Sequence, residues 1–154
     1  MHLHPIDEHG LQLPPMDVAS GFVVDVVQAM IDLYARRGFV PPWIGYLAMQ
    51  NGVCVGMCGF TSPPKDGEVE IAYFTFPDFE GQGVATDMAR ELIRSSRSAA
   101  DSSIEYIAHT LPQMGASTTI LGKLGFVLQG EILHPEDGVV WKWREAPQLI
   151  EPKT

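Results

Sequence analysis

Apolar positions repeat with a helical period in the segment that follows residue 19. Between residues 20 and 38 the apolar side chains fall on one face of a helix and the charged ones on the other. Ser20 can cap the start of this helix and Gly38 can end it. We therefore expect a helix from Ser20 to Gly38 whose buried face consists of Phe22, Val23, Val26, Val27, Met30, Ile31 and Tyr34.

A hairpin is predicted after this helix. Two strand-like runs, Trp43–Gln50 and Val53–Phe60, are joined by Asn51-Gly52. This dipeptide is the strongest short-range signal for a hairpin, because both positions of its turn require a positive φ.

Strands and helices alternate over the rest of the chain. The early strands should pair as antiparallel hairpins, whereas the β-α-β step at residues 68–110 should be parallel and right-handed. The pattern predicts a single α/β domain, with a mixed, mostly antiparallel sheet flanked by helices. The elements expected after the first hairpin are a strand Glu68–Phe76, a helix Gly83–Arg97, a strand Ser102–Thr110, a helix Ala116–Leu124 and a hairpin of Phe126–His134 with Val139–Arg144.

The domain itself is placed at residues 20–146. Residues 1–19 are expected to be a leader and residues 147–154 a C-terminal tail. The leader contains three prolines and three histidines, which a loosely packed segment explains better than a metal site does. We therefore expect no metal.

The formal net charge of −9 limits the kinds of partner that the protein is expected to bind. An acidic surface repels phosphate backbones, so a nucleic-acid partner is not expected. A cationic substrate such as an amine would be attracted, although acidity also serves solubility alone. No apolar run approaches the roughly 20 residues of a membrane span, and no signal peptide is recognisable. We expect a cytoplasmic protein without a membrane partner; a homodimer is compatible with the sequence but not specified by it.

Cys54 and Cys58 are expected to be two buried thiols on one face of a strand. Four residues of strand separate their Cα atoms by about 13 Å, whereas a disulfide needs about 7 Å or less. A nucleophilic cysteine needs a base and a group that stabilises the thiolate. The apolar hairpin that contains both cysteines offers neither.

Gly81 and Gly83 lie between the predicted strand Glu68–Phe76 and the helix Gly83–Arg97. Without Cβ atoms, they let backbone N–H groups approach a ligand. The first N–H groups of a helix have no partner within the helix and lie at the positive end of its dipole. This turn is therefore suited to a pyrophosphate.

Two other phosphate-binding motifs fit this turn less well. Residues 81–86 contain two of the three glycines of a dinucleotide fingerprint, but Asp101 lies before the next strand rather than at its end. A P-loop is excluded because no Gly-Lys-Ser/Thr is present. A glycine turn without a ligand stays open.

Residues 68–86 resemble motif A of the GNAT N-acetyltransferases, whose core is Arg/Gln-x-x-Gly-x-Gly/Ala. In this chain the core runs Glu80-Gly81-Gln82-Gly83-Val84-Ala85. Residues 111–117, followed by 123–126, resemble the closing motif of the family. The layout from Trp43 to Arg144 is most similar to the RimJ/RimL branch, which contains ribosomal-protein N-terminal acetyltransferases and relatives that act on small amines.

The resemblance implies transfer of an acetyl group from acetyl-CoA to a primary amine, by direct attack in a ternary complex. The amine would be a protein N-terminus or a small molecule. Backbone groups of Phe74, Thr75 and Phe76 would line the pantetheine and the thioester. The remaining cofactor-binding residues would be Gly81, Gln82, Gly83, Val84, Ala85, Thr86, Met114 and Ser117.

Catalytic candidates follow from the same resemblance. Strand periodicity places Glu68 and Glu70 on one face, and Glu70 lies where family members carry a base or a water-relaying carboxylate. Glu68 could equally be a solvated charge at the start of the strand, and Glu70 could bind substrate instead. His109 is the rival base. Ser117 could donate to the thiolate or bind the cofactor, or could simply cap a helix.

Three positions depart from the family pattern. Glu80 replaces an Arg or Gln beside the diphosphate, Met114 replaces an Asn that bonds the pantetheine arm, and Leu121 replaces a Tyr acid. These departures motivate an alternative: a catalytically degenerate GNAT domain that binds CoA or a partner without turnover.

Overall fold

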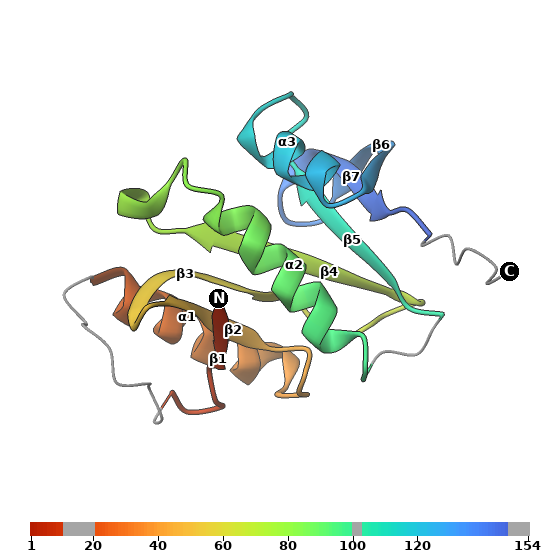
Figure 1. The fold of residues 1–154 in the computed structure, drawn as a ribbon. Coiled ribbons are helices and arrows are strands. Elements are labelled where there is room, and N and C mark those ends of the chain that lie inside the picture. Colours follow the sequence, from red (N-terminus) through yellow and green to blue (C-terminus); the bar gives the residue numbers. More distant parts are fainter. Residues whose placement is uncertain (11–20, 100–102, 148–154) are drawn as a thin grey trace, which may run out of the picture. The chain divides into compact units, whose positions relative to one another are not determined.

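The computed structural model describes residues 1–10, 21–99 and 103–147 (Figure 1). The chain has two compact units, Met1–Tyr106 and Ile107–Thr154. No helix among the described residues is long and apolar enough to cross a membrane.

The first unit is an antiparallel sheet with a helix on each face. The strands lie in the order β1-β2-β3-β4. Figure 1 shows α2 in front of these strands and α1 behind them. The elements are β1 (His2–Pro5), α1 (Gly21–Arg37), β2 (Gly45–Gln50), β3 (Val53–Phe60), β4 (Glu68–Thr75), the 3₁₀ helix η1 (Pro77–Phe79) and α2 (Val84–Ser96).

The second unit contains a helix and an antiparallel sheet in the order β5-β7-β6. Its core includes the buried residues Leu121, Phe126 and Trp143. The indole N–H of Trp143 donates to the hydroxyl of Thr110 over 3.0 Å. The elements are β5 (Glu105–Thr110), whose first two residues belong to the first unit, α3 (Ala116–Lys123), β6 (Phe126–His134) and β7 (Gly138–Glu145).

Helix α1 ends as expected, at Gly38 with a φ of 87° and an N–H that donates to the Tyr34 carbonyl over 2.8 Å. The proposed cap, Ser20, lies outside the described residues. The predicted inner face is buried at its centre. Phe22, however, remains 42% exposed at the start of the helix, where the periodicity predicts burial.

Strand β1 occupies part of the segment that was expected to be a leader. Ile6, just after it, is 1% exposed, and its N–H donates to the Gly45 carbonyl over 2.9 Å. The Tyr34 hydroxyl donates to the Ile6 carbonyl and accepts from the Gly45 N–H, each over 2.9 Å. A four-residue edge strand held by backbone hydrogen bonds carries no periodicity of its own, so the sequence did not reveal it. Residues 11–19 of the leader, with its boundary at residue 19, lie outside the described residues.

The Asn51-Gly52 hairpin is confirmed, with φ values of 52° and 77° at its two turn positions. Further along, β3 contains a bulge. Ala48 pairs with Gly56 but Met49 pairs with Cys54, which leaves Val55 as an extra residue in β3.

The bulge corrects the expectation for the two cysteines. Both are buried and free, but Cys54 belongs to the core cluster beneath α1, and Met57 also contacts that cluster. Because side chains alternate along a strand, Cys58 faces the other way, on the side where Gly56 lies against Met88 of α2. The two thiols therefore lie on opposite faces, since the extra residue changes the alternation between them.

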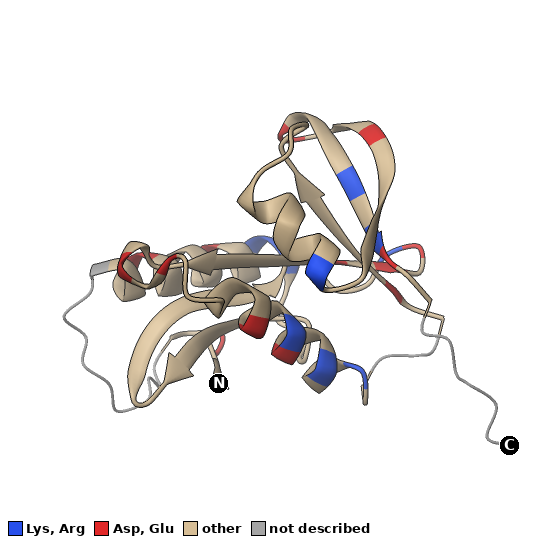
Figure 2. Ribbon diagram, turned by 45° about the horizontal axis from the view of Figure 1, so that its top comes forward, with Lys and Arg blue, Asp and Glu red and all other residues tan. Residues whose placement is uncertain are grey.

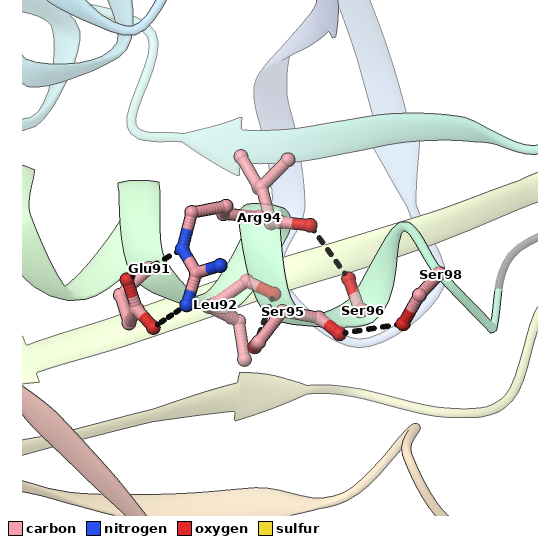
Figure 3. Close-up of polar contacts among 7 residues, drawn as sticks. Glu91, Leu92, Arg94, Ser95, Ser96 and Ser98 are labelled. Carbon is pink, nitrogen blue, oxygen red and sulfur yellow. Dashed lines mark hydrogen bonds and ion pairs between the residues drawn. The ribbon is translucent and has the colours of Figure 1, made fainter.

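Helix α2 buries the predicted apolar stripe of Val84, Met88, Ala89, Leu92 and Ile93. Its last turns are tied by local polar contacts (Figure 3). The Ser95 hydroxyl donates to the Leu92 carbonyl over 3.2 Å, and the Arg94 guanidinium bonds the Glu91 carboxylate. The buried Ser96 hydroxyl lies 2.7 Å from the Tyr106 hydroxyl and so joins the helix to the start of β5.

Strands β4 and β5 begin next to each other. The N–H of Glu105, the first residue of β5, donates to the carbonyl of Gly67, which precedes β4, over 2.8 Å. Helix α2 lies between these two starts in the chain. This connection agrees with the expected β-α-β step.

Candidate functional site

The turn between β4 and α2 has the backbone that an anion site requires. Gly81 and Gly83 have φ values of 76° and 77°, in the left-handed region that L side chains rarely adopt. A Cβ at either position would meet nothing within 4 Å, so the space beside both is open. Gly83 is the N-cap of α2 and no side chain caps the helix start. The first N–H groups of α2 are therefore available to a ligand.

The side chains around this turn have different environments. Gln82 is exposed, Ala85 and Thr86 are partly buried, and Val84 is buried. The Val84 side chain therefore anchors the helix start in the core. A ligand at residues 81–86 would be held mainly by the backbone.

The charges of the turn are acidic. Asp78, Glu80 and Asp87 are exposed, and residues 77–89 contain no Lys or Arg. The first basic side chain on α2 is Arg90, 3.5 Å from Asp87. Figure 2 shows acidic and basic residues in alternation along the exposed side of α2. The positive potential at the start of α2 thus comes from the helix itself.

The backbone groups of the residues at the end of β4 do not all face β3. The Phe76 N–H donates to the Val55 carbonyl over 2.9 Å, and the Phe74 carbonyl lies against Gly56, where a Cβ would come within 2.4 Å of it. The backbone groups of Phe74 and Phe76 therefore face β3. Because N–H and C=O groups alternate sides along a strand, those of Thr75 face away from β3.

Thr75 thus differs from its neighbours, although all three were predicted to offer backbone groups. The Phe76 N–H is already used inside the sheet, which corrects that part of the prediction. The hydroxyl oxygen of Thr75 is buried and has no hydrogen-bond partner among the described residues. A buried polar atom of this kind needs an explanation, and a missing ligand is one.

An aromatic cluster of Phe22, Phe74 and Phe76 lies at the same end of β4. The ring centroids of Phe22 and Phe76 are 5.5 Å apart, those of Phe74 and Phe76 5.8 Å, and those of Phe22 and Phe74 6.2 Å. Phe76 is buried, whereas Phe74 is 43% exposed. The contact of Phe22 with the end of β4 is not predictable from the sequence, because helical periodicity does not show which strand end a residue meets.

Glu70 is held in place on the face of β4 that also carries Phe74. The Thr61 hydroxyl donates to Oε1 of Glu70 over 3.1 Å, and the Thr61 N–H donates to the Glu70 carbonyl over 3.1 Å. Glu68 instead lies at the base of a turn, where its N–H and carbonyl bond those of Lys65. Both carboxylates are partly buried. Their shared face, predicted from the strand period, agrees with the burial of the intervening Val69.

The other candidates belong to the second unit. His109 is partly buried on β5, with its ring centroid 5.1 Å from that of His134. Met114 is 73% exposed in the loop before α3, and Ser117 is exposed in the first turn of α3. Leu121 is fully buried, so this position serves the core. Their placement with Glu70 in one site remains a prediction.

The capping role considered for Ser117 belongs to Thr118. The Gly115 N–H donates to the Thr118 hydroxyl over 2.9 Å, and that hydroxyl donates to the Gly115 carbonyl over 2.9 Å. The Ser117 side chain is thus not needed to cap α3.

The two thiols are unsuited to nucleophilic chemistry. Burial raises the pKa of Cys58 to about 12. Burial also raises the pKa of Cys54, partly offset by a hydrogen bond with the backbone of Gly56. A thiol that stays protonated at neutral pH is a poor nucleophile, so the sequence-based rejection of a cysteine enzyme agrees with the structure.

Comparison with known proteins identifies the family of this chain and supports its fold. The family model of the acetyltransferase (GNAT) domain matches residues 18–127. No curated protein matches this chain. Among solved structures, RimL, the ribosomal L7/L12 alpha-N-protein acetyltransferase, is similar in its apo form, with a TM-score of 0.67 and 19% identity over 93% of this chain and 90% of RimL.

Two structures with bound ligands are also similar. RimL in complex with coenzyme A has a TM-score of 0.64 and 21% identity, over 93% of this chain and 92% of that one. The acetyltransferase yncA from Salmonella typhimurium with acetyl-CoA has a TM-score of 0.60 and 18% identity, over 82% of this chain and 78% of that one. These similarities confirm the expected α/β fold, and the family match confirms the resemblance to the GNAT acetyltransferases.

Proposed function

This chain belongs to the acetyltransferase (GNAT) family, and from that membership we infer that it transfers an acetyl group from acetyl-CoA to a primary amine. The class of enzyme is a GNAT-type N-acetyltransferase, as the sequence resemblance indicated. The acceptor is a protein N-terminus or a small amine. The observation that carries the inference is the turn at Gly81 and Gly83, which follows η1 and leaves the start of α2 without a side-chain cap.

The residues present fit the co-substrate. The N–H groups at the start of α2 would hold the pyrophosphate. The space beside Gly81 and Gly83 is open, since no protein atom lies within 4 Å of a Cβ placed there. Thr75 would contact the pantetheine and the thioester with its outward backbone groups and its buried hydroxyl. The complexes of RimL with coenzyme A and of yncA with acetyl-CoA support this choice of co-substrate.

Acetyl-CoA supplies an activated thioester, which a neutral amine attacks with release of the CoA thiol. The chain must position the amine, accept its proton and stabilise the developing oxyanion. We assign Glu70 as the group that accepts the proton of the amine, because the Thr61 hydroxyl orients its carboxylate. The Thr75 N–H, which faces away from β3, is the donor we assign to the oxyanion. Met114 and Ser117 would complete the pantetheine contacts, and His109 remains the rival base.

A cytoplasmic location is part of this proposal. It is supported by the two free thiols among the described residues, because disulfides are rare in reducing compartments.

A test combines binding with turnover. Acetyl-CoA should raise the melting temperature and NAD should not, and free CoA thiol should appear when acetyl-CoA is mixed with an active amine from a panel. Stabilisation by NAD alone would contradict the assignment of the co-substrate.

The second candidate function is a CoA-binding protein without catalysis. It is favoured by the acidic Glu80 at the turn and by the buried Leu121, which leaves no Tyr acid at that position. Tight acetyl-CoA binding without thiol release across peptides, polyamines and aminoglycosides would favour this candidate.

A further inference from the structure

The aromatic cluster of Phe22, Phe74 and Phe76 is more open than an ordinary core. Phe22 and Phe74 are 42% and 43% exposed, while Phe76 beneath them is 2% exposed. The Phe22 ring stacks on Phe76 at an interplanar angle of 24°, and the Phe74 ring meets Phe76 edge to face at 63°. Phe76 thus lies buried beneath the other two rings, which present accessible aromatic surface.

This surface lies at a position that the proposed chemistry uses. Phe74 is adjacent to Thr75, whose backbone and hydroxyl we assign to the thioester. Its side chain points to the face of β4 that carries α1, because its cross-strand partner Met57 contacts the core beneath α1. Two exposed aromatic rings that touch each other beside a reacting centre are a binding surface rather than scattered surface residues.

The charge on the same face distinguishes between possible occupants. Glu70, the assigned base, shares this face of β4 with Phe74, whereas Glu68 lies at the other end of the strand, about 20 Å from Phe74. A face with a carboxylate and aromatic rings complements a molecule that has both a positive charge and an apolar group. Aromatic rings also attract ammonium groups directly. An extended acyl chain is apolar but carries no charge, so it would match the aromatic rings but not the negative charge.

We propose that Phe22, Phe74 and Phe76 form an acceptor subsite for an amine with an aromatic or branched aliphatic group next to its nitrogen, such as a peptide whose first residue is apolar. This proposal rests on the proposed acetyl transfer. Phe22 and Phe74 are its specificity-determining residues. Phe76 supports them from below.

The test compares short peptides that differ only in their first residue, Phe, Leu, Ser or Gly. Binding to the CoA-saturated protein is measured by calorimetry, and turnover is measured separately by thiol release with acetyl-CoA. We expect the Phe and Leu peptides to bind about tenfold or more tightly than the Gly peptide, since one filled apolar contact discriminates by about that factor. We expect kcat/KM to follow the same order.

Phe22→Ala and Phe74→Ala should reduce this preference to about twofold or less. Phe22→Leu, which keeps apolar volume, should keep most of the preference and serves if the alanine variants fold poorly. The matched control is Val24→Ala, since Val24 is 67% exposed on the same helix and should not affect the preference.

Equal binding of all four peptides to the unaltered protein would overturn the subsite. A change of preference between acetyl-CoA and hexanoyl-CoA in Phe74→Ala, with no change among peptides, would also overturn it in favour of an acyl pocket. Preferential binding of the Phe peptide without turnover would support the subsite while contradicting the proposed function. The two failures are therefore distinguishable.

Discussion

The Thr61 hydroxyl donates a hydrogen bond to Oε1 of Glu70 over 3.1 Å, from the end of β3 to the neighbouring strand β4. The same two residues are also joined through their backbones. The carboxylate of Glu70 is thus oriented by Thr61, the residue that follows β3. We therefore favour it over Glu68 as the group that accepts the proton.

Glu70→Gln should lower kcat about 100-fold or more, the usual contribution of a general base, and leave the Kd of acetyl-CoA unchanged. Thr61→Val should lower kcat about fivefold, the worth of one hydrogen bond, and Thr61→Ser should restore it. Steady-state kinetics and calorimetry provide both measurements. Glu68→Gln is the matched control and should have little effect. A large loss in His109→Gln with full activity in Glu70→Gln would identify the histidine as the base.

Glu80→Gln should tighten CoA binding by about two- to fivefold, because it removes a negative charge beside the start of α2. The exposure of Glu80 puts the effect at the lower end of this range and makes it shrink in salt. Calorimetry at low and high ionic strength measures both. Glu8→Gln, which removes another exposed carboxylate from the loop after β1, is the charge-matched control. Unchanged or weaker binding in Glu80→Gln would mean that this carboxylate does not face the diphosphate.

Gly83→Ala should destabilise the protein by about 1–2 kcal/mol, the cost of a left-handed conformation for an L residue. The added Cβ meets no atom, so the loss reflects the backbone alone. Gly122→Ala should have the opposite effect on the free energy of unfolding. Gly122 is exposed in α3, lacks a positive φ and also has open space, so alanine should stabilise by up to about 1 kcal/mol. Urea denaturation measures both, and equal effects of the two changes would contradict the role assigned to the turn.

Stability should fall above pH 9. The pKa of Cys58 is about 12 in the folded protein, against an ordinary value of 9.0. Below pH 9 the thiol is protonated in both states and contributes nothing to the pH dependence. Between pH 9 and 12 the unfolded chain loses this proton and the folded one keeps it, so the free energy of unfolding falls by about 1.4 kcal/mol per pH unit.

Cys58→Ala should reduce the slope of the stability curve between pH 9 and 10 and leave the part that comes from Cys54, whose pKa burial also raises. In that interval Tyr46 and Tyr73, whose pKa values burial raises from 10.0 to about 12, contribute little. Denaturation at several pH values under reducing conditions measures the slope, which does not depend on any loss of packing at neutral pH. An unchanged slope would indicate that the buried thiol does not cause it.

Much of the fold follows from local signals. The turn residues Asn51 and Gly52 and the alternating strands beside them are sufficient to place the first hairpin, because these signals act between neighbours in the chain. The stripe of α2 and its start at Gly83 follow from helical periodicity and a glycine without a side-chain cap. The GNAT resemblance at residues 80–85 depends on the same short-range features, and the family match agrees with it.

Other features depend on contacts between distant segments. Strand β1 forms by pairing with β2, and Tyr34 bridges Ile6 and Gly45 beside it. Four residues are too few to show a strand periodicity. The extra residue Val55 changes the alternation of β3, so Cys54 and Cys58 point to opposite faces although their spacing predicts one face.

The turn at Gly81 and Gly83 was determined by the sequence alone, since positive φ angles and a free helix start are properties of a few consecutive residues. The tertiary structure decided which groups surround that turn. It engaged the Phe76 N–H with Val55, left the backbone of Thr75 facing away from β3, and brought Phe22 against Phe74. These outcomes require the register of β3 against β4 and the docking of α1, which depend on packing across the whole unit and not on any local pattern.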